Sequence, residues 1–183
     1  MRVGAQALGL ALALGAAEWM HPGGAFAQTP AGRSTPVSQQ ARHTVNFPGK
    51  PAESVKESKL ASGQTVSTHL RDLRAGDRYY GTAWTPVPDA PSTPAGQAQM
   101  LEVAAAEALK ANPGGKMLSK QKVTVSGIDG LAFVIDKPQT KTYTRHQVFV
   151  VSGVLVEQTY AGPAGTETWR EAEQFFKSLK LLP

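Results

Sequence analysis

The sequence has 183 residues, of which 41% are hydrophobic and 18% are charged, and it contains no cysteine. This length and composition are typical of one globular domain, and the lack of cysteine excludes disulfides, thiolate nucleophiles and cysteine-ligated zinc or iron–sulfur centres. The formal net charge is +5, but the lysines and arginines are scattered and form no basic block. A nucleic-acid partner is therefore not expected.

The N-terminal segment has the pattern of a cleavable signal peptide. Arg2 precedes an apolar run at residues 8–17, which is too short to cross a bilayer, and Ala25 and Ala27 place small residues at the two positions that a signal peptidase reads. A buried N-terminal helix is the alternative, but the run lacks polar residues at helical spacing. We therefore predict that residues 1–27 are removed and that the protein is periplasmic or secreted.

Residues 28–41 are mostly proline, glycine, serine, threonine and glutamine, a composition that predicts a flexible linker before a single domain at residues 42–183. Within that domain, alternating apolar and polar residues predict strands. The first group lies at residues 43–47, 53–61, 64–73 and 78–85, with a turn at Ser62-Gly63. The second group lies at residues 116–125, 131–136, 142–151 and 154–160, with a connection at residues 126–130 and a two-residue turn at Ser152-Gly153.

Two segments have helical periodicity. Residues 95–112 carry an alanine-rich apolar stripe and end at an Asn-Pro-Gly-Gly stop. A terminal helix is predicted from Thr168, which stands three residues before Glu171 in the spacing of a capping box. The order of four strands, a helix, four strands and a helix predicts an α+β fold, with a single antiparallel sheet of about seven or eight strands sandwiched by the two helices.

Several segments resemble a known family. They are VNFPGKP at residues 45–51, GGK at residues 114–116, VTVSGIDG at residues 123–130 leading to Phe133, and residues 145–160 followed by residues 172–181. The chain resembles the PsbP-like α/β/α-sandwich family, named for the extrinsic P subunit of photosystem II and similar to many small exported bacterial proteins of unknown role. The resemblance implies an α/β/α sandwich and an assembly or binding role rather than catalysis. It names no activity, because its motifs are turn and core positions.

The last hairpin supplies the main candidate binding residues. A two-residue turn at Ser152-Gly153 pairs the strands so that polar and aromatic side chains share one face. The candidates are Arg145, Tyr160, Gln147, Gln158 and Tyr143, with Tyr80 and Trp84 from an earlier strand. They have two interpretations: the mouth of a cleft for a small anionic ligand or a peptide, or core packing with Arg145 and Tyr160 closing the sheet. We favour packing, because aromatic residues on strands usually pack.

No catalytic or metal-binding constellation is evident in the sequence. His43, His69 and His146 lie on separate predicted strands without a local carboxylate partner, and we expect them to be half-exposed. No Gly-x-Ser-x-Gly elbow is present. Of the acids considered for acid–base chemistry, all but the last lie at predicted strand ends or turns; they are Asp72, Asp77, Asp129, Asp136 and Glu157. We therefore expect no catalytic residues, no metal and no cofactor.

The sequence thus favours a monomeric, non-catalytic binding or accessory protein of the cell envelope, acting on an unknown envelope protein or small ligand. Two alternatives remain open. A small periplasmic enzyme would need an enclosed cavity lined by titratable groups. A small-ligand carrier with a site on the sheet face would need a large apolar pocket, for which the chain has limited room.

Overall fold

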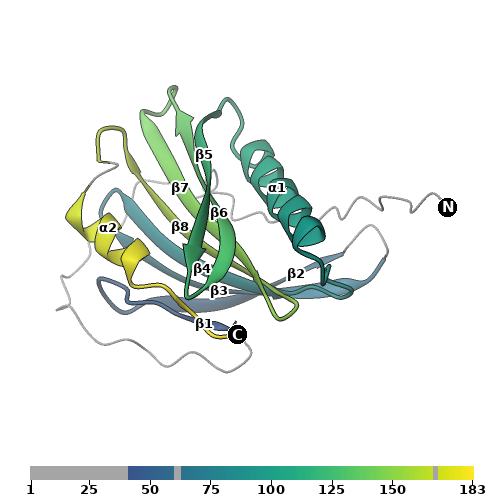
Figure 1. Ribbon diagram of the computed structural model, residues 1–183. Coiled ribbons are helices and arrows are strands. Elements are labelled where there is room, and N and C mark those ends of the chain that lie inside the picture. Colours follow the sequence, from purple (N-terminus) through teal and green to yellow (C-terminus); the bar gives the residue numbers. More distant parts are fainter. Residues whose placement is uncertain (1–40, 60–62, 167–168) are drawn as a thin grey trace.

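The computed structural model describes residues 41–59, 63–166 and 169–183. Its centre is a seven-stranded sheet in the order β2-β3-β4-β8-β7-β6-β5, with antiparallel neighbours throughout (Figure 1). The strands are β2 (Ala52–Lys59), β3 (Thr65–Ala75), β4 (Arg78–Pro86), β5 (Lys116–Val125), β6 (Ile128–Lys137), β7 (Thr142–Val151) and β8 (Val154–Pro163).

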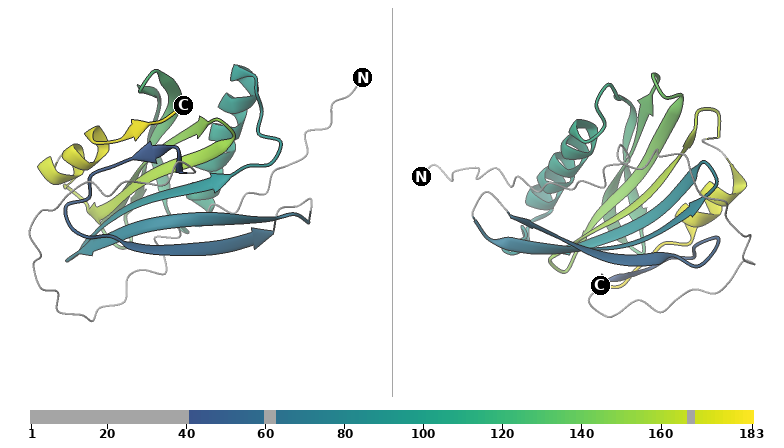
Figure 2. Two further views of the ribbon diagram at one scale, coloured as in Figure 1. Left: turned by 90° about the horizontal axis from the view of Figure 1, so that it is seen from below. Right: turned by 180° about the vertical axis from the view of Figure 1, so that it is seen from behind.

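The two helices cover opposite faces of this sheet. Helix α1 (Pro94–Lys110) packs on β6 and β7, and α2 (Arg170–Lys177) lies on the other side, as the turned views in Figure 2 show. Buried Met100, Leu101 and Ala104 of α1 meet buried aliphatic residues of the sheet, whereas the core under α2 is mainly aromatic. The predicted α+β sandwich, a sheet between two helices, is confirmed.

One predicted strand lies outside the main sheet. Strand β1 (His43–Thr44) is only two residues long and pairs with β9 (Lys180–Leu181), a strand that was not predicted. The predicted strand 43–47 ends early because the Asn46 backbone N–H donates to the Ser178 side chain and Phe47 packs its ring on Phe175. Two residues are too few to show an alternating pattern, so the sequence does not reveal the β1–β9 pair.

The strand connections are tighter than predicted. The link between β5 and β6 is the two-residue turn Ser126-Gly127, not residues 126–130, and both residues have positive φ, 52° and 77°. Two consecutive positive φ values match the twist of a hairpin, so both strands run up to the turn. Likewise β3 continues to Ala75, and β8 continues three residues beyond its predicted end at residue 160.

Some predictions fall on residues that are not described. The predicted signal peptide and nearly all of the predicted linker lie outside the described residues, as do Ser62 of the first predicted turn and Thr168 of the predicted capping box. Ala41, the last residue of that linker, is described and fully buried. The N-cap position of α2 is occupied by Trp169, whose side chain makes no capping hydrogen bond.

The turn between β7 and β8 has the predicted register. Ser152 and Gly153 both have positive φ, and the turn pairs Gln147 with Gln158 and Arg145 with Tyr160. The Gly153 carbonyl also accepts a hydrogen bond from the Val87 backbone N–H at 2.8 Å. The turn therefore sets the central register and holds the start of the segment that leads into α1.

A very close approach occurs on the α2 face at Gly130. A Cβ at this position would lie 2.3 Å from Cδ1 of Phe149 and 2.5 Å from the Val148 carbonyl oxygen. Both are far inside van der Waals contact, so β6 can lie against β7 here only because residue 130 has no side chain.

We predict that Gly130→Ala lowers the free energy of unfolding by about 1–3 kcal/mol through overpacking, measured by urea denaturation. Phe149→Leu removes the ring that would clash, so the Gly130→Ala/Phe149→Leu double variant should lose less stability than the sum of the two single changes. Strictly additive losses would show that the ring does not cause the constraint.

His43 of β1 is fully buried and places Nδ1 2.6 Å from the Ala41 carbonyl oxygen. Burial, helped by the positive charge of Arg71 and opposed by the hydrogen bond to Ala41, lowers the pKa of His43 below its ordinary value. The folded protein therefore binds a proton at His43 less readily than the unfolded chain does.

It follows that stability should fall as the pH drops below about 6.5, where His43 of the unfolded chain takes up a proton and folded His43 does not. Denaturation midpoints between about pH 5 and pH 8 would measure this loss. His43→Gln should reduce the slope of stability against pH below about pH 6.5. Above about pH 7.5 the stability curves of the variant and the wild-type protein should run parallel. Equal slopes throughout would exclude His43 as the cause.

Candidate functional site

All seven residues predicted as binding candidates lie on the α2 face of the sheet. The cross-strand pairs Gln147–Gln158, Arg145–Tyr160 and Tyr80–Tyr160 place them together, and Trp84 pairs with Val156 on the same face. The structure separates them into two groups, one packed in the core and one at a cavity.

Tyr80, Tyr160 and Gln158 belong to the core beneath α2. The Tyr80 ring meets Tyr160 at 5.1 Å and Phe175 at 5.3 Å, both in edge-on geometry. The Gln158 amide nitrogen donates to the Phe175 carbonyl oxygen at 2.8 Å. These three side chains are buried and hold α2 on the sheet, so they serve as packing residues.

Trp84 contacts two histidines that the sequence places on separate predicted strands. His69 stacks on the Trp84 ring at 4.9 Å, and His43 meets it edge-on at 5.7 Å. Of these two, His43 is fully buried rather than half-exposed as predicted, because β1 lies across the sheet at this point. The cluster is a packed aromatic group.

The remaining three candidates, Tyr143, Arg145 and Gln147, line a cavity of about 320 Å³ that also includes Gln121 of β5 and Glu173 of α2. We call it the α2-side cavity. Arg145 forms an ion pair with Glu173 and lies 4.3 Å over the ring of Phe176, which holds the guanidinium in place. The buried Gln147 Oε1 has no hydrogen-bond partner among the residues that the structure describes. Part of the predicted set therefore borders a small cavity, and Arg145, the cation among its described lining residues, is already paired.

The α2 face also carries a buried polar row, of which the sequence indicated the Gln147–Gln158 pair and not Arg71 and Thr82. Arg71, Thr82, Gln158 and Gln147 are neighbours in register across four adjacent strands, and each is buried. Arg71 lies 3.2 Å from the exposed carboxylate of Glu53, and its guanidinium lies 5.7 Å from the Phe47 ring. Register counting across all the hairpins would have been needed to find this row.

Two buried tyrosine hydroxyls on this face provide a matched test of packing. The Tyr143 hydroxyl donates to the Thr166 carbonyl oxygen at 2.9 Å, whereas the Tyr160 hydroxyl has no hydrogen-bond partner in the described ranges. We predict that Tyr143→Phe lowers the free energy of unfolding by about 0.5–1.5 kcal/mol and that Tyr160→Phe leaves it unchanged or higher. Thermal denaturation of both variants measures this difference, and the opposite order would contradict the assigned packing.

The α1 face contains a buried histidine–carboxylate pair. His146 Nδ1 lies 2.8 Å from Glu157 Oε1, and the Thr159 hydroxyl donates to the same oxygen at 3.0 Å. The prediction of a half-exposed His146 is wrong, and its carboxylate partner, which is not local in the sequence, is supplied by the neighbouring strand. His146 is 1% exposed, stacks on Phe133 at 4.6 Å, and finds Glu157 diagonally across the β7–β8 pair. Neither residue of the pair is in the lining of the α2-side cavity.

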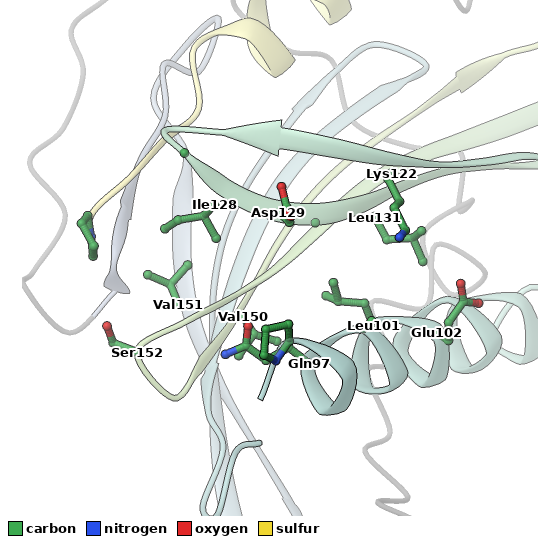
Figure 3. Close-up of a pocket in the computed structure, with 15 residues that line it drawn as sticks. Gln97, Leu101, Glu102, Lys122, Ile128, Asp129, Leu131, Val150, Val151 and Ser152 are labelled. Atoms are coloured by element: carbon green, nitrogen blue, oxygen red, sulfur yellow. The ribbon is translucent and has the colours of Figure 1, made fainter. Parts of the chain in front are cut away.

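The larger cavity lies between α1 and the strands, as Figure 3 shows. It has a volume of about 510 Å³ and is bordered by the β5–β6 hairpin, the N-terminal half of α1 and the β7–β8 turn. We call it the α1 groove, and its labelled lining residues are Gln97, Leu101, Glu102, Lys122, Ile128, Asp129, Leu131, Val150, Val151 and Ser152.

The α1 groove has an apolar interior and charged residues at its rim. Leu101, Leu131 and Val150 are buried core residues whose outer surfaces form its walls. At the rim, Glu102 pairs with Lys120 at 2.6 Å, and the Asp129 carboxylate accepts a hydrogen bond from the Thr124 hydroxyl at 2.8 Å.

Lys122 differs from the other charged residues at the rim, because it makes no hydrogen bond or ion pair with any described residue. In Figure 3 its side chain extends from β5 toward α1, whereas the Asp129 carboxylate is directed away from the helix. The groove therefore combines apolar walls with an ammonium group that is unpaired within the described part of the chain. The sequence did not indicate the α1 groove, since the walls of the groove come from segments far apart in the chain.

The histidine and acidic side chains and the helices of the described residues bear on metal binding and membrane insertion. Within residues 41–59, 63–166 and 169–183, no three histidine or acidic side chains gather in a way that would hold a metal ion. No helix in this part of the chain is long and apolar enough to cross a membrane.

Comparison with solved structures identifies the fold. The solution structure of cyanobacterial PsbP (CyanoP) from Synechocystis sp. PCC 6803 superposes with a TM-score of 0.54 over 87% of this chain and 98% of that one, at 9% sequence identity. A Pseudomonas aeruginosa protein of unknown function covers 66% of this chain and 94% of its own, with a TM-score of 0.41 and 11% identity. No protein-family model and no curated protein sequence matches the chain. The chain therefore has a PsbP-like fold, as its sequence resemblance predicted.

Proposed function

We propose that this chain is an exported, non-catalytic binding protein that holds a small ligand in the α1 groove. The observation that carries the proposal is the groove itself, a hollow of about 510 Å³ with buried leucine and valine walls and few polar groups. Ligand sites in proteins are commonly concave, mostly apolar and about 300–1,000 Å³ in volume, with a small number of polar groups that fix orientation.

The arrangement of titratable groups supports binding rather than catalysis. The carboxylates at the groove, Glu102 and Asp129, are exposed and already engaged with Lys120 and Thr124. A general acid or base must be able to reach a bound substrate. The buried pair His146–Glu157 is 1% and 3% exposed and lies apart from the lining of the groove. These side chains are better suited to stabilising the sheet.

Export is proposed from the N-terminal pattern, an apolar run of signal-peptide length followed by small residues at a cleavage site. In the periplasm or the medium, a small binding domain without catalytic groups can act as a carrier or as an accessory to an envelope protein. Mass spectrometry of the protein recovered outside the cytoplasm should give a chain that begins at Gln28.

A neutral probe tests whether the groove binds ligands at all. N-phenylnaphthylamine becomes fluorescent in apolar sites and carries no charge at neutral pH. We predict that the whole protein binds it and that Ala98→Trp, which places an indole in the groove lining, weakens binding about tenfold or more.

The matched control is Ala106→Trp, which adds the same side chain at an exposed position of α1 outside the groove lining. It should leave the dissociation constant within about twofold, since surface changes away from a site have little effect. Absence of probe binding, or equal losses in both variants, would rule out the α1 groove as the ligand site.

A further inference from the structure

We infer that the α1 groove selects amphipathic anions, with the apolar body of the ligand between α1 and the sheet and its acidic head group at the Lys122 ammonium. The ligand class is a free single-chain carboxylate. This inference rests on the proposed function and adds the chemistry of the ligand.

The apolar part of the argument comes from the groove walls. Leu101 of α1, Leu131 of β6 and Val150 of β7 are each less than one-tenth exposed, and all three belong to one hydrophobic cluster. A ligand in the groove thus covers the margin of the main core and meets hydrocarbon on both sides. An extended alkyl chain suits these walls, and a compact polar molecule would lose hydrogen bonds to water without replacing them.

The charged part of the argument depends on which groups already have partners. Among the described residues, three charged side chains line the α1 groove, Glu102, Lys122 and Asp129, and Lys120 lies beside it as the partner of Glu102. Lys120 and Glu102 neutralise each other at 2.6 Å, which leaves Lys122 and Asp129.

The directions of these two side chains then decide which sign of ligand charge the groove favours. Asp129 binds the Thr124 hydroxyl and points away from α1, whereas Lys122 extends into the space between β5 and the helix. A head group that enters beside α1 therefore meets the Lys122 Nζ first. An anion gains an ion pair there, and a cation is repelled.

The expected preference is modest, because Lys122 is exposed and solvent screens its charge. An exposed ion pair of this kind changes a dissociation constant by about twofold to fivefold. The alkyl chain supplies most of the affinity, and the ammonium supplies discrimination among ligands of equal length.

The test uses three ligands that share one chain length, namely decanoate, decanol and decylammonium. Each displaces N-phenylnaphthylamine from the whole protein at pH 8 and low ionic strength. We expect the order decanoate tightest, decanol intermediate and decylammonium weakest, with neighbouring members about twofold to fivefold apart. About 0.5 M salt should compress the order.

Lys122→Gln should abolish the preference for decanoate over decanol while leaving the affinity for decanol unchanged. Lys116→Gln is the matched control, since Lys116 is an exposed lysine of the same strand outside the groove lining. It should retain the full order.

The outcomes separate the inference from the proposed function. If decanol binds as tightly as decanoate, or if the preference survives Lys122→Gln, the inference fails while the groove remains a ligand site. If neither the neutral probe nor decanol binds, the proposed function fails as well. If Lys122→Gln loses the preference for decanoate and Lys116→Gln keeps it, both the inference and the proposed function are supported.

Discussion

The register of β7 against β8 is the constraint on which both sides of the domain depend. The two-residue turn at Ser152-Gly153 leaves no freedom in the pairing, and a shift of one residue would exchange the two faces. With this register, Gln158 and Tyr160 lie under α2, while His146 and Glu157 lie on the α1 face. The same pair of strands therefore supplies an aromatic core to one helix and an aliphatic core to the other.

The two faces differ in what they leave open. Under α2, aromatic rings and the Arg145–Glu173 pair fill most of the space, and the hollow that remains is the smaller of the two. Against α1, alanine occupies much of the helix face, as at Ala104, Ala105 and Ala108, so the helix lies close to the strands along its middle. Toward its N-terminal half the strands end in turns, and the larger groove forms there.

The parts of the fold that were predictable are those with local signals. The β7–β8 turn and the bounds of β5 and β7 follow from turn residues and alternation within a few positions. The β1–β9 pair has no such signal, because each strand has two residues and they are more than 130 positions apart. The α1 groove also arises from distant segments. His146–Glu157 is an intermediate case, since counting from Ser152-Gly153 places Glu157 diagonal to His146.

The hydrogen bond from the Val87 backbone to the Gly153 carbonyl joins the end of β4 to the β7–β8 turn just before the chain enters α1. This anchor is made by main-chain atoms alone, so it depends on backbone path and is indifferent to most side chains. At the other end of this segment the Thr93 hydroxyl accepts a hydrogen bond from the Gly96 backbone N–H at 3.2 Å. The position at which the helix begins is therefore fixed twice, once by main-chain atoms at the sheet and once by a single side chain at the cap.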